Sequence, residues 1–315
     1  MIRGQGFGHA KIILIGEHGV VHGHPALAAG LSAGIQADAV AGSGRLRVPA
    51  WSLEARAGDG STAGRALAAI LARLRVSDLD FHLEAAIPSR AGLGSSAAMA
   101  VAIARAAAAA SGGALAAPAL AAAVDDAEAV FHGTPSGIDA AAAFGGNVGR
   151  FRRGEGWRPV PVLQGMQICV GLTGRPRDTG AQVAAVGRLR ERAPVVGKMM
   201  ELFGELVDAG ERALAIGDVD GLGRLLDVAH GVLCGLRVSS PEIETLVHGA
   251  RAAGAIGAKL TGAGGGGAVI ALAPGHERDV LARWRHDGFE GFVTAVGPPL
   301  AAVAHQHGHA SGAAS

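Results

Sequence analysis

The sequence predicts an α+β protein built from two lobes. Short apolar or alternating runs, typical of strands, are interspersed with helical periodicity along the whole chain. Helices dominate the second half, and residues 152–156 form a polar break between the halves. A length of 315 residues also favours two domains. We therefore expect lobes at residues 1–155 and 156–304, followed by a disordered tail of small and polar residues at 305–315.

The first lobe is expected to begin with a buried strand, because residues 10–16 form an apolar run that ends at a glycine. A helix follows, in which apolar residues are spaced i, i+3, i+4, i+7 from Leu67. Strict alternation over residues 79–87 then predicts a half-buried strand that ends at Pro88. Helices are predicted to begin near residues 95 and 114, and a short one to follow an N-cap at Ser136.

The second lobe is expected to combine helices with an antiparallel sheet. Ser240 followed by proline is a typical N-cap with proline at the first helical position. The predicted helices lie at 179–192, 196–215, 219–236, 240–253 and 277–286. The predicted strands lie at 166–172, 258–261, 268–272 and 292–296, the middle two joined by a glycine-rich turn.

Composition excludes several classes of partner. The chain has 28 Lys and Arg against 27 Asp and Glu, a net charge of +1, which argues against nucleic acid or an anionic membrane surface. Its two cysteines form neither a disulfide framework nor a metal-type Cys spacing, and both are expected to be small core residues. No signal peptide or spanning segment is evident, so we expect a cytoplasmic protein.

A phosphate-binding loop is predicted where the alternating strand ends. Its residues are Pro88, Ser89, Arg90, Ala91, Gly92, Leu93, Gly94, Ser95, Ser96, Ala97 and Ala98. Glycines allow close approach of the backbone to a phosphate, and the first turn of the following helix offers unpaired N–H groups. A helix N-cap after a tight turn is the alternative that this segment leaves open.

Two further segments carry candidate chemistry. Residues 262–267 contain five glycines directly between two expected strands, which favours an ordered turn over a flexible loop. Glu128 near the end of one helix and Asp139 in the next are separated by a proline turn, so they can converge on one cleft. Solvated helix-surface charges are the alternative. Lys11 in an apolar strand needs either a partner or a path to water.

Together these segments resemble the GHMP small-molecule kinases. Residues 88–98 match the second motif of that family, and residues 259–267, Lys-Leu-Thr-Gly-Ala-Gly-Gly-Gly-Gly, match its third. Residues 11–23 and 132–139 resemble the branch of the family that phosphorylates mevalonate. The chain departs from the usual pattern at His9-Ala10, Ala140, Ala229, Arg237 and Ala268, none of which removes a phosphate or metal group.

The resemblance implies a GHMP-kinase-like fold, with a βαβ-containing N-terminal lobe, a ferredoxin-like C-terminal lobe and the active site in the cleft between them. It implies transfer of the γ-phosphate of ATP to the C5 hydroxyl of (R)-mevalonate. The loop at 88–98 would hold the phosphates, and Ser96 and Glu128 would hold Mg²⁺. Asp139 would accept the hydroxyl proton, and Lys11 would keep Asp139 ionised.

By the same resemblance Glu17, His18 and Thr179 would face the mevalonate, together with Lys11 and Asp139. The resemblance leaves a homodimer open. Two other functions are considered. One is a kinase of another small alcohol, such as a sugar, homoserine or phosphomevalonate; a phosphorylated substrate would need a basic cluster that the sequence lacks. The other is a non-catalytic nucleotide-binding regulator, against which the presence of Lys11, Glu128 and Asp139 together argues.

Overall fold

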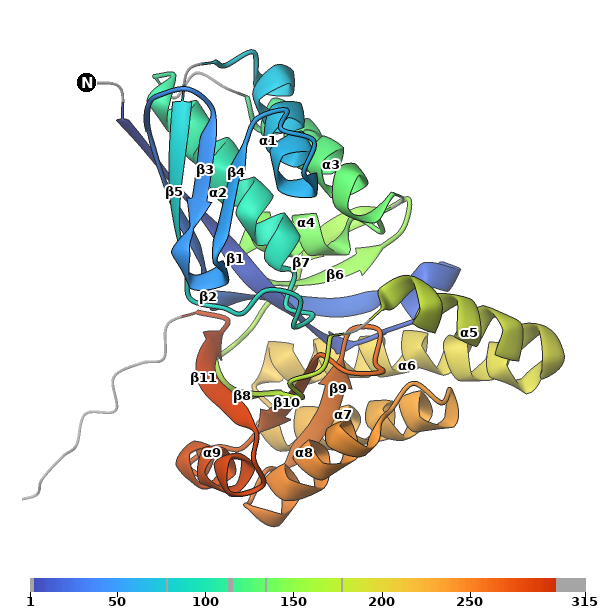
Figure 1. Cartoon of the computed structure of the whole chain (residues 1–315). Helices are drawn as coiled ribbons and strands as arrows, with labels where there is room; N and C mark the ends of the chain where they lie inside the picture. The colour runs from blue at the N-terminus through green and yellow to red at the C-terminus, as the bar shows by residue number, and fades with distance from the viewer. Residues whose placement is uncertain (1–2, 78, 113–115, 134, 177, 299–315) are drawn as a thin grey trace, which may run out of the picture.

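Two sheets, each covered by helices, make up the protein (Figure 1). The structure is a computed structural model that describes residues 3–77, 79–112, 116–133, 135–176 and 178–298. The predicted tail at 305–315 lies outside these residues. In the part of the chain that is described, no helix has both the length and the apolar character needed to cross a bilayer.

The first sheet has the strand order β4-β3-β5-β2-β6-β7, with β1 paired to β2. Neighbouring strands run antiparallel except β3 and β5, which are parallel and are joined through β4 and helix α1. This is the expected βαβ connection. The strands are β1 (Arg3–Ile15), β2 (Ala26–Ala41), β3 (Arg45–Val48), β4 (Leu53–Arg56), β5 (Leu79–Ala85), β6 (Val148–Arg152) and β7 (Gly156–Pro159). Two 3-10 turns, η1 (Gly19–His22) and η2 (Pro49–Trp51), lie between them.

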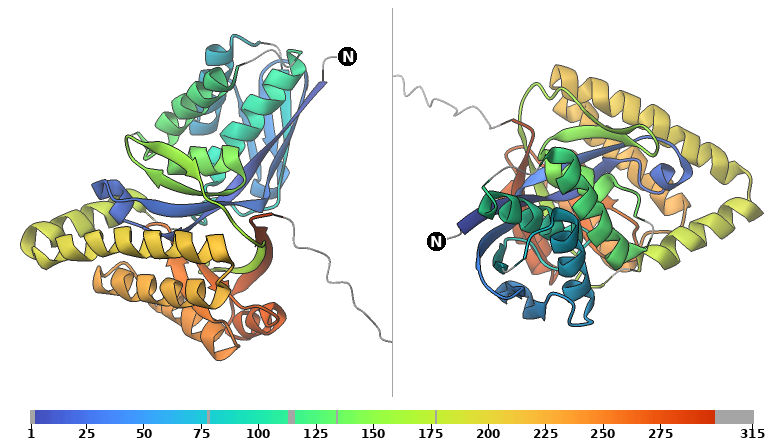
Figure 2. Two further views of the ribbon diagram at one scale, coloured as in Figure 1. Left: turned by 180° about the vertical axis from the view of Figure 1, so that it is seen from behind. Right: turned by 90° about the horizontal axis from the view of Figure 1, so that it is seen from above.

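Helices cover one face of this sheet, and Figure 2 shows them from two further sides. They are α1 (Thr62–Leu74), α2 (Ser95–Ala110), α3 (Ala117–His132) and α4 (Ile138–Gly145). Helix α2 lies unusually close to β1. A Cβ added at Gly8 would come within 2.0 Å of the carbonyl oxygen of Ala98, and one at Gly4 within 2.2 Å of that of Ala106. The scarcity of aromatic residues and the abundance of Gly and Ala thus follow from backbone-to-backbone packing at the centre of this lobe.

The second sheet has the order β11-β8-β10-β9, and its paired strands are antiparallel. Its strands are β8 (Met166–Leu172), β9 (Gly257–Thr261), β10 (Ala268–Leu272) and β11 (Glu290–Val296). The helices of this lobe are α5 (Thr179–Arg192), α6 (Val195–Ile216), α7 (Val219–Gly235), α8 (Pro241–Ala252) and α9 (Glu277–His286). Helices α7, α8 and α9 pack on the sheet, whereas α5 and α6 extend to one side of it (Figure 1).

The two lobes are joined by buried polar contacts between their sheets. The backbone N–H of Ile13 on β1 donates to the hydroxyl of Thr261 on β9 at 2.8 Å, and that hydroxyl donates back to the Ile13 carbonyl at 3.1 Å. Near the other end of the interface, the Ser32 and Thr294 hydroxyls are 3.1 Å apart. The first strand of one lobe is therefore held in register with the glycine-flanked hairpin of the other.

The structure departs from the expected elements mainly in the first lobe. Strand β1 is much longer than the predicted run at 10–16, and β2, β3 and β4 were not predicted. The polar break at 152–156 is a hairpin turn, because β7 pairs with β6 in the first sheet. The sheet therefore continues to Pro159, beyond the expected boundary at residue 155; the division into two lobes remains a prediction. Helix α4 is capped by Gly137 in a left-handed conformation and not by Ser136.

Candidate active site

A cavity of about 920 Å³ lies where segments of both halves of the chain meet. Its wall comes from four regions: residues 51–63, the loop and first turn of α2, the end of α3 with the first turn of α4, and residues 176 and 178–180 at the start of α5. Trp51, Met99 and Phe131 supply apolar surface, whereas Ser95, Ser96, His132 and Asp139 supply polar groups. A largely apolar cavity with a few convergent polar side chains is typical of a small-molecule site.

Lys11 and Asp139 are brought together, as the resemblance implies. The Lys11 Nζ lies 3.0 Å from Asp139 Oδ1; the lysine side chain is 2% exposed and the aspartate 27%. Asp139 is in the first turn of α4 and lines the cavity. Lys11 is a buried residue of β1, and its ammonium contacts the Asp139 carboxylate. Gly94 makes room for the lysine, since a Cβ there would be 2.8 Å from Lys11 Cγ. Substitution of Gly94 would also strain a backbone with φ of +69°.

The loop at 88–98 leads into α2 as predicted. The residue before α2 is Gly94, which has a left-handed conformation. Because glycine has no side chain, the N–H groups of the first turn have no side-chain cap. Ser89, Arg90, Gly92, Gly94, Ser95 and Ser96 line the cavity. Pro88 and Ala91 face a neighbouring hollow of about 490 Å³, and Leu93, Ala97 and Ala98 are buried in the core. The backbone N–H of Lys11 donates to the Leu93 carbonyl at 2.9 Å, which fixes the loop on β1.

Glu128 is a buried carboxylate beside this loop. Its Oε1 is buried without a hydrogen-bond partner, and its Oε2 is 3.9 Å from His132 Nε2. Burial first, and then the nearby Asp139 charge, raise the pKa of Glu128 to about 7, although its hydrogen bond to Ser96 opposes this. An unpaired buried carboxylate oxygen near a hydroxyl and a second carboxylate is the donor set that Mg²⁺ prefers. Ser96, Glu128 and Asp139 therefore fit a magnesium ion.

Glu17 is buried away from the cavity wall, and its contact with mevalonate stays a prediction. Its side chain is fully buried and its Oε1 forms an ion pair with Lys259, which is buried as deeply. The Lys259 ammonium also donates to the carbonyl oxygens of Leu260 at 2.6 Å and Ile13 at 3.4 Å. Glu17 is thus held between β1 and β9 and does not line the cavity. The position of Glu17 follows from the needs of Lys259: a buried ammonium with three protons needs three acceptors, and Glu17 supplies one of them.

His18 contacts the glycine-rich turn between β9 and β10, whereas Thr179 lines the cavity. His18 is buried, and its Nε2 donates to the Ala263 carbonyl at 2.9 Å, since a carbonyl only accepts. Thr179 is exposed, opens α5 and lines the cavity. The turn itself is ordered: the Gly265 N–H donates to the Val238 carbonyl at 2.8 Å. This contact agrees with the predicted ordered turn.

Two comparisons with known proteins bear on the family. The sequence matches the description of the GHMP kinase N-terminal domain over residues 58–147 and that of the GHMP kinase C-terminal region over 195–289. It is 36% identical over 315 residues to the mevalonate kinase of Pyrococcus horikoshii, covering 91% of this chain and 93% of that protein. It is 37% identical over 284 residues to the mevalonate kinase of Aeropyrum pernix, covering 83% of this chain and 86% of that protein.

The chain belongs to the GHMP kinase family. This makes it an ATP-dependent phosphotransferase and accounts for the meeting of the loop at 88–98 with Asp139 in one cavity. The fold agrees with this assignment. The structure of L. major mevalonate kinase in complex with R-mevalonate superimposes with a TM-score of 0.82 at 29% identity, covering 95% of this chain and 97% of that one. The Methanococcus jannaschii mevalonate kinase shares the fold with a TM-score of 0.80 at 20% identity.

Sequence reasoning did not single out several residues at this GHMP kinase site. His132 lines the cavity, and its Nε2 is 3.0 Å from the Ser96 hydroxyl. Trp51 lines the cavity from η2 and donates its indole N–H to the Ile87 carbonyl at 2.9 Å. The i, i+4 spacing of Glu128 and His132 in the sequence indicates that the two side chains lie on the same face of the helix, and it could have identified His132 as a site residue. Nothing local signals Trp51, because its position depends on the packing of η2 against β5.

Proposed function

We propose that this GHMP kinase phosphorylates (R)-mevalonate at its C5 hydroxyl, with ATP as donor and Mg²⁺ as the metal. The observation that carries the mechanism is the Lys11–Asp139 pair at the cavity floor, 3.0 Å apart, beside an uncapped helix N-terminus. The choice of substrate rests on the similarity to mevalonate kinases over most of the chain. In this mechanism the residues of the cleft share two tasks in the phosphoryl transfer.

The first task is to hold the phosphates of ATP. The backbone N–H groups of Gly94, Ser95 and Ser96 begin α2 and lie at the cavity wall, where the positive end of the helix dipole favours an anion. The apolar surfaces of Trp51 and Met99, in the same cavity, suit a flat purine. Ser96 and Glu128 would hold the Mg²⁺, which when bound neutralises charge on the phosphate oxygens.

The second task is to direct the acceptor hydroxyl. Asp139 reaches the cavity and accepts a hydrogen bond from Lys11 through Oδ1, so this oxygen is fixed and the carboxylate stays oriented. An aliphatic alcohol is a poor acid, so Asp139 orients the hydroxyl and takes its proton late in the transfer. Lys11 supplies positive charge next to the transferred phosphoryl group.

Removal of either magnesium-binding side chain should raise the Mg²⁺ concentration needed for half-maximal rate. Ser96→Ala deletes one oxygen ligand, and Glu128→Gln deletes the carboxylate charge while keeping the shape. The measurement is the rate at saturating ATP over a series of Mg²⁺ concentrations. Asp126→Asn, which removes from the same helix a carboxylate that pairs with Arg73 at the surface, is the matched control and should leave the titration unchanged. Unshifted titrations for both site variants would remove these residues from the metal site.

Thr179 should contribute to binding of mevalonate more than of ATP. Thr179→Val keeps the shape of the side chain and deletes its hydroxyl, so KM for mevalonate should rise about 10-fold, the effect of one lost hydrogen bond. Thr245→Val on the surface of α8 is the matched control. Steady-state kinetics with each substrate varied in turn separate the two effects. An effect on KM for ATP alone would move Thr179 out of the mevalonate pocket.

A panel of alcohols tests the substrate itself. We expect phosphorylation of (R)-mevalonate and poor turnover of galactose, homoserine and phosphomevalonate, since polar groups arranged for one substrate are left unpaired by another. The assay couples ADP formation to a dye-linked or NADH-linked readout. Comparable kcat/KM for mevalonate and any of the other three would overturn the choice of substrate and leave the kinase mechanism standing.

A further inference from the structure

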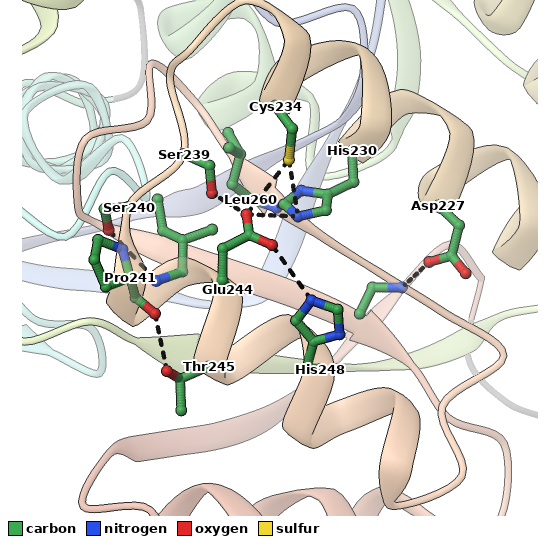
Figure 3. Close-up of polar contacts among 12 residues, drawn as sticks. Asp227, His230, Cys234, Ser239, Ser240, Pro241, Glu244, Thr245, His248 and Leu260 are labelled. Atoms are coloured by element: carbon green, nitrogen blue, oxygen red, sulfur yellow. Dashed lines mark hydrogen bonds and ion pairs between the residues drawn. The ribbon is translucent and has the colours of Figure 1, made fainter.

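A second cluster of polar side chains lies outside the kinase cavity, between α7 and α8 (Figure 3). His230 and Cys234 are four residues apart on α7, and Glu244 and His248 are four residues apart on α8. Residues at this spacing project from the same side of a helix. The two pairs face each other, and Figure 3 shows Cys234, His230 and His248 arranged around the Glu244 carboxylate.

The distances within the cluster are those between the ligands of a single small ion. His230 Nε2 lies 3.5 Å from Cys234 Sγ, and Cys234 Sγ lies 3.4 Å from Glu244 Oε1. His230 Nε2 and Glu244 Oε1 are 3.2 Å apart. A tetrahedral zinc ion with Zn–S of about 2.3 Å and Zn–N or Zn–O of about 2.0–2.1 Å has edges of about 3.5 Å to sulfur and about 3.3 Å between nitrogen and oxygen. The three measured edges match that tetrahedron.

We propose that His230, Cys234 and Glu244 bind a Zn²⁺-like divalent ion. Thiolate and imidazole ligands favour Zn²⁺ over Mg²⁺ or Ca²⁺, which prefer oxygen. Such an ion ties α7 to α8 across the turn at residues 236–240. His248 lies outside this ligand set: its Nε2 is 3.5 Å from Glu244 Oε2, and its side chain is 70% exposed. The Ser239 hydroxyl, which also donates to Glu244, orients the carboxylate.

In the metal-free cluster, the hydrogen bonds fix which nitrogen of His230 carries the ring proton. The Leu260 N–H donates to His230 Nδ1 at 3.4 Å, so Nε2 carries the ring proton and donates it to Glu244. When a metal binds Nε2, the ring proton moves to Nδ1 and the long contact with Leu260 is given up. The metal replaces the thiol proton of Cys234, which is released to solvent. Three hydrogen bonds are thus exchanged for three metal–ligand bonds: those that the His230 Nε2–H and the Cys234 thiol donate to Glu244, and that of the Leu260 N–H to Nδ1. The Nδ1–H is then left facing the Leu260 N–H, a cost that the metal–ligand bonds must exceed.

A reactive thiol is the competing explanation for Cys234, and its surroundings argue against it. The Cys234 Sγ lies 3.4 Å from the Glu244 carboxylate, so its near neighbour is negatively charged. Reactive cysteines have a lowered pKa and a positively charged neighbourhood. In the described part of the chain the other cysteine, Cys169, is on β8 and fully buried in the core, and it belongs to a different element from Cys234.

Cobalt spectroscopy on the full chain tests the site, because Co²⁺ adopts the same geometry as Zn²⁺ and its absorption reports the ligands. Tetrahedral Co²⁺ with a thiolate ligand gives visible ligand-field bands and a sulfur-to-cobalt charge-transfer band. We expect both bands at one Co²⁺ per chain in the wild type, and their disappearance on addition of one equivalent of Zn²⁺. His305→Ala, His307→Ala and His309→Ala are combined in the background protein, so that the histidines near the C-terminus contribute no signal.

Cys234→Ser should abolish the charge-transfer band, and the matched Cys169→Ser should keep it. Glu244→Gln should weaken cobalt binding at least 10-fold, and circular dichroism establishes that each variant is folded. As a second readout, Zn²⁺ should raise the Tm of the wild type and not that of Cys234→Ser. Absence of a charge-transfer band in the wild type, or its retention in Cys234→Ser, would overturn the proposal. No ATP or mevalonate is present, so the result is independent of the proposed kinase activity.

Discussion

Asp139→Asn should lower kcat by at least about 100-fold and leave nucleotide affinity nearly unchanged. Asparagine keeps an oxygen that can accept the hydrogen bond from Lys11, which lies 3.0 Å from the aspartate in the native protein. It cannot take up the proton of the acceptor hydroxyl. The variant therefore removes the proposed chemical role and preserves the packing of α4 against β1, which alanine would not.

The measurement combines steady-state kinetics with direct binding of a nucleotide. The matched control for a general loss of charge is Asp208→Asn. It removes from α6 a half-exposed carboxylate that pairs with Arg150 on β6. Its kcat should stay within about 2-fold of the wild type, as for an exposed residue outside the site. Turnover of Asp139→Asn within a few-fold of the wild type would show that Asp139 neither receives nor directs the proton.

The elements of the second lobe could be predicted because their signals are local. Helix α5 spans the predicted residues 179–192, and α8 begins at the predicted Ser240 cap. In the first lobe the longest missed element is β2. It pairs with β1, β5 and β6, and its Ala-rich and Gly-rich sequence alternates only over residues 35–39. Such a strand is stabilised by its neighbours and not by its own residues, so a local pattern cannot reveal it.

The residues of the site also divide into those that local sequence patterns reveal and those that only the tertiary fold brings together. The phosphate loop and the pair Glu128 and Asp139 are separated by short stretches of chain, so their spacing is visible in the sequence. The partner of Glu17 is Lys259, more than 200 residues away, and only the joining of the two sheets brings them together. The polar cluster at α7 and α8 has no Cys–Cys spacing that would indicate a metal site; its signal is two i, i+4 pairs that mix Cys, His and Glu.

Glu17→Gln should lower the free energy of unfolding by about 3–5 kcal/mol, the usual effect of removing one partner of a buried ion pair. Both side chains are fully buried. Burial raises the pKa of Glu17 and lowers that of Lys259, so it opposes both charges, and their mutual attraction offsets it. Without the carboxylate, the Lys259 ammonium keeps only two backbone carbonyls and no counter-charge.

Denaturation in urea measures the effect, and a double-mutant cycle isolates it. Lys259→Met should also destabilise, and Glu17→Gln with Lys259→Met should lose less than the sum of the two, because no unpaired charge remains buried. Glu155→Gln, which breaks the exposed pair with Arg152, is the matched control and should cost below about 1 kcal/mol. Equal losses for Glu17→Gln and Glu155→Gln would contradict the structural role. A rise in KM for mevalonate without loss of stability would instead return Glu17 to the substrate pocket, where the resemblance placed it.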